Sequence, residues 1–182
     1  APDTECLDLA RNGRSSKSFL LEGHWQECLD AKPNVILLQF GHNDQPGKGP
    51  KLETTPDTSY TDYMSIYIDE ARAIGATPIL VTSLSRRTWG DDNKIHSTLI
   101  PYVEAVKALG LAKHVPVIDL HSASIALYES MGKEAFNALS AKTTAGEVDN
   151  THLNAKGSDV IGKLVADLLQ QVDPAIASHL KP

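Results

Sequence analysis

The sequence has no apolar run long enough to cross a membrane, since its longest, VILLQF from Val35, has only the length of a β-strand. It also has no stripe of positive charge. Its 17 lysines and arginines are scattered along the chain, and its 23 acidic residues give a formal net charge of -6. A chain with this charge distribution is not expected to bind along a phosphate backbone. We therefore expect neither a membrane nor a nucleic acid as a partner.

Cysteine is scarce too, and this limits both disulfide bonds and metal sites. Cys6 and Cys28 are the only two cysteines. They allow at most one internal disulfide, and the alternative is two small buried thiols. No cysteine pair has the spacing of zinc ligands, and the seven histidines are too scattered to suggest a metal cage. We predict no metal.

The residues that are present indicate an α/β protein. A chain of 182 residues with 41% hydrophobic composition is long enough for one compact domain, residues 1–182. Short β-rich runs alternate with stretches of helical period, which is typical of a mainly parallel sheet. Strands are expected at Cys6–Ala10, Val35–Phe40, Thr77–Thr82 and Val115–Leu120. Helices are expected within SKSFLLEGHWQECLDA, SYTDYMSIYIDEARAIG, Ile95–Leu109, SASIALYESMG, EAFNALSA and Asn154–Gln171, the last with Asn154 as its N-cap.

Polar residues follow the expected strands, where an open parallel sheet binds its ligands. After VILLQF comes GHND, in which Gly41 permits a sharp turn and the Asn43 amide can serve as a neutral donor to an oxyanion. Asp44 is expected to cap or orient the same loop. The alternative is an Asx-type turn, in which Asn43 and Asp44 bond only to the nearby backbone.

A second candidate stretch, VDNTHLNAKG, precedes the last helix and is expected to lie outside any strand. Asp149 and His152 are three residues apart, a spacing that brings a carboxylate to an imidazole in a turn or a first helical turn. The carboxylate would fix the tautomer of the ring, whose other nitrogen then acts as a general base. The alternative is a capping Asp149 with an exposed His152.

Together these stretches resemble the SGNH, or GDSL-type, hydrolases. The resemblance is closest to the rhamnogalacturonan acetylesterase branch, and it runs from about Leu7 to Leu169. It rests on NGRSSKSFLLEGHW, FGHNDQ, YIDEARAIGATPILVTSLSRR, VPVIDLHSASIALYESMG and VDNTHLNAKG. The resemblance implies that the Gly13 N–H and the Asn43 amide form an oxyanion hole. It also implies that His152 is the general base and that Asp149 orients it.

The same resemblance implies a three-layer α/β/α sandwich with a flavodoxin-like parallel sheet, no cofactor, and secretion or a periplasmic location. The implied activity is hydrolysis of carboxylic esters. It would remove acetyl groups from carbohydrate, of the pectin or rhamnogalacturonan type, or from other small esters. The expected partner is therefore an acetylated carbohydrate.

The sequence departs from the family in one block. The family begins with a strand ending in Gly-Asp-Ser, whose serine is the nucleophile, and no GDS occurs in this sequence. We therefore expect the first strand of the sheet to be missing and the domain to be incomplete at its N-terminus. Three explanations stay open: a fragment of an ordinary enzyme, a chain that closes its sheet as a homodimer, and a catalytically inactive carbohydrate-binding or assembly module. Of these we favour the homodimer.

Two features beside Gly13 have alternative interpretations. Ser15, Ser16 and Ser18 are expected to be helix-capping residues rather than a substitute nucleophile. Arg14 is a candidate for binding the carboxylate of a uronic acid in the substrate. The alternative is an ion pair between Arg14 and an acidic residue nearby.

Overall fold

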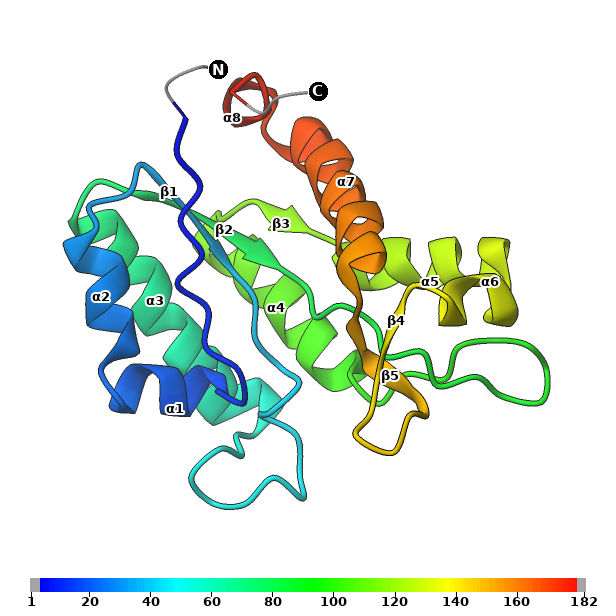
Figure 1. The fold of residues 1–182 in the computed structure, drawn as a ribbon. Coiled ribbons are helices and arrows are strands. Elements are labelled where there is room, and N and C mark those ends of the chain that lie inside the picture. The colour runs from blue at the N-terminus through cyan, green and yellow to red at the C-terminus, as the bar shows by residue number, and fades with distance from the viewer. Residues whose placement is uncertain (1–3, 180–182) are drawn as a thin grey trace. The chain divides into compact units, whose positions relative to one another are not determined.

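The computed structural model of the chain describes residues 4–179 (Figure 1). The chain divides into two compact units. Unit 1 comprises Ala1–Ser83 and Leu99–Ile118, and unit 2 comprises Leu84–Thr98 and Asp119–Pro182. Unit 1 contains a three-stranded sheet and unit 2 a two-stranded one. No helix within residues 4–179 has both the length and the apolar character that a bilayer span requires.

Unit 1 is built on a parallel sheet. Its strands are β1 (Val35–Leu38), β2 (Thr77–Val81) and β3 (Val117–Ile118), and they are hydrogen-bonded in the order β1-β2-β3. Leu80 of β2 is opposite Leu38 on one side and Val117 on the other. Parallel neighbours need crossover connections, and helices supply them. The predicted α/β class, with a parallel sheet flanked by helices, is confirmed.

The helices of unit 1 begin and end where the sequence supplies caps and breaks. α1 (Ser16–Leu21) and α2 (His24–Asp30) replace the single helix expected here, because Gly23 adopts φ +84° between them. α3 (Thr61–Ala73) follows a short π-helical turn, η1 (Pro56–Tyr60). α4 (Ile100–Lys113) begins later than the predicted Ile95, because the proline that follows Ile100 favours a first helical turn.

The core of unit 1 is formed by its helices and the sheet. One face of α3 is buried, and its residues recur at helical spacing: Met64, Tyr67, Ile68 and Ala71. α4 approaches β3 closely because residue 110 is a glycine. A Cβ at Gly110 would lie 2.2 Å from Cγ2 of Val117. The sheet therefore holds the loop that follows β1 on a well-packed support.

The strand predicted at Cys6–Ala10 is wrong. Residues 4–11 have no regular secondary structure, and most of them are exposed. A strand needs hydrogen bonds to a neighbour, and within residues 4–179 no strand pairs with this segment or with the outer edge of β1. Cys6 and Cys28 are both free thiols, the first exposed and the second half-buried.

Unit 2 combines helices with an antiparallel hairpin that the sequence did not predict. The helices are α5 (Leu120–Met131), α6 (Lys133–Asn137), α7 (Ala155–Val172) and α8 (Pro174–Ala177). The hairpin strands are β4 (Ser140–Lys142) and β5 (Val148–Leu153). The expectation that VDNTHL lies outside any strand is therefore wrong, because this stretch pairs with β4.

Asn154 joins the hairpin to the helix that follows it. As predicted, it caps α7, and its side chain accepts a hydrogen bond from the Gly157 N–H at 3.0 Å. Its Nδ2 donates to the carbonyl oxygen of Ala138 at 2.8 Å, in the segment before β4. The Asn154 N–H donates to the carbonyl oxygen of Leu139 at 3.0 Å.

Candidate active site

In unit 1, the loops that contain Gly13 and Asn43 lie against each other. Nδ2 of Asn43 donates a hydrogen bond to the carbonyl oxygen of Arg14 at 3.1 Å. Gly13 has φ +76° and is exposed, and no hydrogen bond among residues 4–179 uses its N–H. A free backbone N–H beside a fixed amide is a suitable pair of donors for a developing oxyanion. The structure thus brings these two predicted donors into adjoining loops.

Asp44 fixes the loop that presents Asn43. Its buried carboxylate accepts hydrogen bonds from the Ser16 hydroxyl at 2.5 Å, the Gly41 N–H at 3.0 Å and the Thr54 hydroxyl at 3.0 Å. Burial raises the pKa of Asp44, and these hydrogen bonds oppose the rise. Asp44 therefore does more than form a local turn, and the expectation that it orients this loop is confirmed.

Gly41 makes the predicted sharp turn after β1. Its φ of +125° is one that residues with a side chain rarely adopt, and a Cβ there would lie 2.3 Å from Oγ of Ser83. The Ser83 hydroxyl occupies that space because it donates to the carbonyl oxygen of Phe40 at 2.6 Å. The turn and the packing of Ser83 both require glycine at this position.

The three serines after Gly13 are structural. Ser15 is the N-cap of α1: its hydroxyl accepts from the Ser18 N–H at 3.2 Å, and its N–H donates to the Ser18 hydroxyl at 2.9 Å. The Ser16 hydroxyl donates to Asp44. Ser15 and Ser16 are 0% exposed and Ser18 is 3% exposed. The expected capping is confirmed for Ser15 and Ser18, and none of the three presents its hydroxyl to solvent.

Arg14 forms an ion pair within unit 1. Its Nε lies 2.6 Å from Oε2 of Glu22, and its Nη1 donates to the carbonyl oxygen of Asn12 at 3.1 Å. The hydrogen bond from Arg14 lowers the pKa of Glu22. Of the two alternatives for Arg14, the pair with a nearby acid is the one observed. Recognition of a substrate carboxylate by Arg14 stays a prediction.

In unit 2, Asp149 and His152 form a hydrogen-bonded pair on β5. Nδ1 of His152 lies 2.7 Å from Oδ2 of Asp149. Oδ1 of Asp149 accepts from the N–H groups of Thr151 at 2.7 Å and His152 at 3.0 Å. Partial burial opposes ionisation of Asp149, but these hydrogen bonds outweigh it and lower its pKa to about 2. The predicted pairing is observed, and so is the alternative, since Asp149 caps the N–H groups of Thr151 and His152 and the His152 side chain is exposed. The catalytic role of the pair stays a prediction.

The two members of this pair differ in exposure. The Asp149 side chain is 22% exposed and the His152 side chain 72% exposed. The carboxylate is therefore partly sheltered, while the ring reaches solvent. Because Nδ1 is engaged with Asp149, the nitrogen available for proton transfer is Nε2.

The pair lies on an irregular part of the hairpin. β4 and β5 pair at Ser140 with Leu153 and at Lys142 with Val148, so the single residue 141 on β4 faces residues 149–152 on β5. A bulge of this kind interrupts the ladder of backbone hydrogen bonds and redirects side chains. Of the two settings that their spacing suggested, a turn and a first helical turn, Asp149 and His152 approach each other in a turn within this irregular stretch of β5.

Arg87 lies against this bulge, and sequence reasoning did not single it out. Its Nη2 donates to the carbonyl oxygens of Asp149 and His152, each at 2.8 Å. The one sequence signal was its place in SLSRRTW, directly after an expected strand. An arginine at that position of the sequence is equally consistent with an exposed surface residue, so this signal could not identify it.

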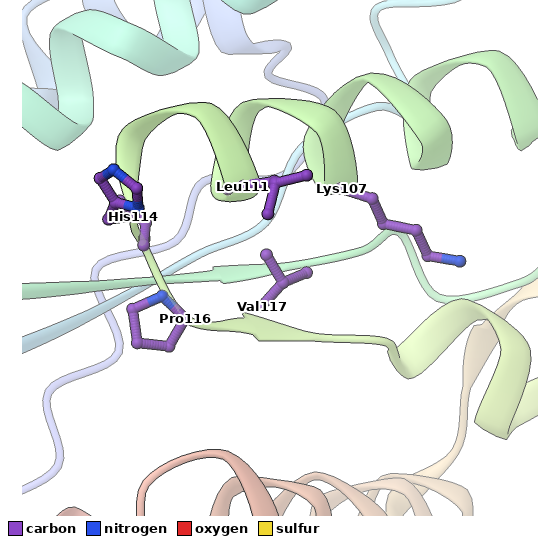
Figure 2. A pocket seen from close by; sticks show the side chains of 7 residues that line it. Lys107, Leu111, His114, Pro116 and Val117 are labelled. Atoms are coloured by element: carbon purple, nitrogen blue, oxygen red, sulfur yellow. The ribbon is translucent and has the colours of Figure 1, made fainter.

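The pocket in Figure 2 lies elsewhere in unit 1 and has a volume of about 480 Å³. The end of α4 and the start of β3 line it, and Leu111, His114, Pro116 and Val117 are among the lining residues. It contains no predicted site residue, and it lies at the amino end of β3, whereas Gly41 follows the carboxyl end of β1. Among residues 4–179, no three His, Cys, Asp or Glu side chains cluster closely enough to hold a metal ion.

The parallel sheet flanked by helices makes this an α/β protein. The Asn43 amide on its glycine turn in unit 1 and the hydrogen-bonded Asp149–His152 pair in unit 2 are groups of the kind that acyl hydrolysis uses. The chain belongs to the GDSL-like Lipase/Acylhydrolase family, which matches residues 2–160. The resemblance to the SGNH, or GDSL-type, hydrolases is thereby confirmed.

Known proteins similar to this chain include carbohydrate esterases. Rhamnogalacturonan acetylesterase RhgT of Bacillus subtilis (strain 168) is 35% identical over 181 residues, which cover 94% of this chain and 76% of RhgT. The solved structure of the Bacillus subtilis protein YXIM has a TM-score of 0.79 and 25% identity, over 92% of this chain and 46% of that one. This chain thus spans less than half of the YXIM chain. Axe2, an acetylxylan esterase from Geobacillus stearothermophilus, shares the fold with a TM-score of 0.64 and 17% identity, over 88% of this chain and 68% of Axe2.

Proposed function

We propose that this chain is a carbohydrate acetylesterase, which removes acetyl groups from plant cell-wall polysaccharide of the rhamnogalacturonan type. The observation that carries the proposal is the 2.7 Å hydrogen bond between His152 and Asp149. The Asp149 carboxylate remains ionised at neutral pH, because its pKa is about 2. The names of RhgT, a rhamnogalacturonan acetylesterase, and Axe2, an acetylxylan esterase, support acetylated carbohydrate as the substrate class.

In this proposal His152 is the general base. Asp149 accepts the Nδ1–H bond, so Nε2 is free to take the proton from an attacking hydroxyl, and the carboxylate stabilises the imidazolium that forms. The negative charge that develops on the carbonyl oxygen is stabilised by the Gly13 N–H and the Asn43 amide. The imidazolium then returns its proton to the departing sugar oxygen. The attacking hydroxyl is not assigned to a residue. If it belongs to water, acetate is released directly; if it belongs to a side chain, a water molecule activated by Nε2 in the same way then releases acetate from the acetyl-enzyme.

Hydrolysis of an activated acetate ester, 4-nitrophenyl acetate, tests these roles. His152→Ala should abolish enzymatic turnover, and Asn43→Ala should lower kcat by about 10²- to 10³-fold, the effect of losing one oxyanion donor. His96→Ala is the matched control, since His96 is also an exposed imidazole and lies 3.0 Å from an acid, Asp92, but that acid is 55% exposed whereas Asp149 is 22% exposed. The control should retain the wild-type rate. Equal rates in the His152→Ala and His96→Ala proteins would refute the proposed function.

A second candidate function is carbohydrate binding without catalysis, and the serines beside Gly13 favour it. Ser15, Ser16 and Ser18 are at most 3% exposed, so their hydroxyls are not presented to an ester. A fluorophosphonate that labels reactive serines, with mass-spectrometric detection, separates the two functions. A labelled serine with His152-dependent turnover supports the esterase. No label and no turnover, together with retention on acetylated polysaccharide, supports the binding protein.

A further inference from the structure

Arg87 is a buried cation within unit 2. The residue is 4% exposed, and its guanidinium carbon lies 5.8 Å from the centre of the Tyr128 ring and 5.6 Å from that of Phe136. The two rings attract the cation, but they do not replace the hydrogen bonds that its N–H groups make in water. A buried guanidinium therefore needs oxygen acceptors close by.

The acceptors of Arg87 are the carbonyl oxygens of the bulge. Nη2 donates to Asp149 and His152 at 2.8 Å each, and Nη1 donates to Thr151 at 3.5 Å. The backbone N–H of Arg87 donates to the carbonyl oxygen of Asn150 at 2.8 Å. Each of the four consecutive carbonyls of residues 149–152 thus accepts a hydrogen bond from this one residue.

Arg87 also reaches the other strand of the hairpin. Its Nε donates to the hydroxyl of Ser140 at 3.0 Å, and Ser140 is opposite Leu153 at the end of the bulge. The guanidinium is planar and its donors have fixed directions, so these acceptors are held at set positions relative to one another. A lysine has a single mobile ammonium group and cannot reproduce this arrangement.

The geometry of the bulge decides whether Asp149 and His152 meet. The Asp149 carboxylate accepts from the His152 ring and from the N–H groups of Thr151 and His152, so the backbone from 149 to 152 must fold back on itself. The hairpin ladder is interrupted here and does not impose that shape. We propose that Arg87 is a positioning residue for the general base, which holds both ends of the bulge so that His152 stays in hydrogen-bond reach of Asp149. This role rests on the proposed function.

The first test does not depend on catalysis. The ¹³C resonance of the Asp149 carboxyl, assigned with the Asp149→Asn variant, is titrated from neutral to strongly acidic pH. Wild type should titrate with a midpoint of about 2, and Arg87→Met should shift the midpoint toward the ordinary value of 3.8. Arg87→Lys should give a value between them, because it keeps the charge and loses the fixed donors.

Arg72→Met is the matched control. Arg72 also donates through Nη2 to two carbonyl oxygens, of Lys113 at 2.9 Å and His114 at 3.2 Å, but it is exposed and belongs to unit 1. Its loss should leave the Asp149 midpoint unchanged. A midpoint of about 2 in folded Arg87→Met, or a midpoint in Arg87→Lys equal to that of wild type, would overturn the proposal, because Arg87→Lys keeps the charge and loses only the fixed donors. If Arg87→Met does not fold, Arg87→Lys decides by the same criterion.

The second test uses hydrolysis of 4-nitrophenyl acetate. Arg87→Lys should lower kcat by about 10- to 100-fold and leave KM within about twofold, since a displaced base weakens the chemical step rather than binding. An unchanged kcat would count against the role. If wild type shows no His152-dependent hydrolysis, the proposed function fails, and the titration of Asp149 still decides whether Arg87 positions the pair.

Discussion

Replacing Asp149 by Asn should make the free energy of unfolding less dependent on acid pH. The pKa of Asp149 is lowered from 3.8 to about 2 in the folded chain. A lowered carboxyl pKa means that folding favours the ionised form. Its contribution to stability is therefore complete above 3.8 and is lost as the pH falls through about 2. At full value this shift corresponds to about 2 kcal/mol. Solvent screens the pair, which reduces the expected contribution to about 1 kcal/mol.

Urea unfolding of wild type and Asp149→Asn at a series of pH values measures this contribution. The difference in unfolding free energy between them should shrink by about 1 kcal/mol from neutral to strongly acidic pH. Asp92→Asn is the control. Asp92 also binds an imidazole, His96, which lowers the pKa of Asp92, but its side chain is 55% exposed. The difference in unfolding free energy between wild type and Asp92→Asn should therefore change less with pH. A difference for Asp149→Asn that is the same at both ends of the series would refute the hydrogen-bonded geometry of the Asp149–His152 pair.

Three further predictions concern unit 1. Gly41→Ala should lower the unfolding free energy by about 2–4 kcal/mol, because it adds both strain and a clash with Ser83. Gly47 has φ +89°, and a Cβ added there would have no atom within 4 Å. Gly47→Ala should therefore lower the unfolding free energy by only about 1 kcal/mol, measured by urea unfolding. Ser15→Ala should cost about 1–2 kcal/mol through loss of the α1 cap, measured in the same way. The predicted homodimer should appear in light scattering as twice the mass of the chain, since no strand among residues 4–179 pairs with the outer edge of β1; a monomer mass would contradict it.

The parallel sheet and its helices were predictable because their patterns are local. The stripe of buried residues on α3 recurs at helical spacing, and the cap of α7 is an asparagine directly before the helix. The sequence of Cys6–Ala10 could not reveal that this segment forms no strand, because a strand depends on a neighbour as well as on its own residues. Gly23 was a glycine inside a helical pattern, and only the structure shows that it breaks the helix there.

The candidate site was predictable to the extent that it depends on side chains of characteristic chemistry. Asn43 on its glycine turn and the Asp149–His152 pair belong to this group. The hairpin was missed because VDNTHL is apolar only at its two ends, so it lacks the alternation of a half-buried strand. Arg87 was missed for a different reason. Its acceptors are main-chain carbonyls, which every residue possesses and which leave no mark in the sequence.

The side chain of Asn154 makes the position of His152 depend on a cooperative unit of folding. It bonds at once to the first turn of α7 and to the segment before β4, so it links the two segments. In hydrogen exchange the N–H groups of Gly157 and Asn154 should therefore exchange together, as one locally unfolding segment. Because His152 lies two residues before this junction, we expect the opening of that segment to displace the ring from Asp149 as well.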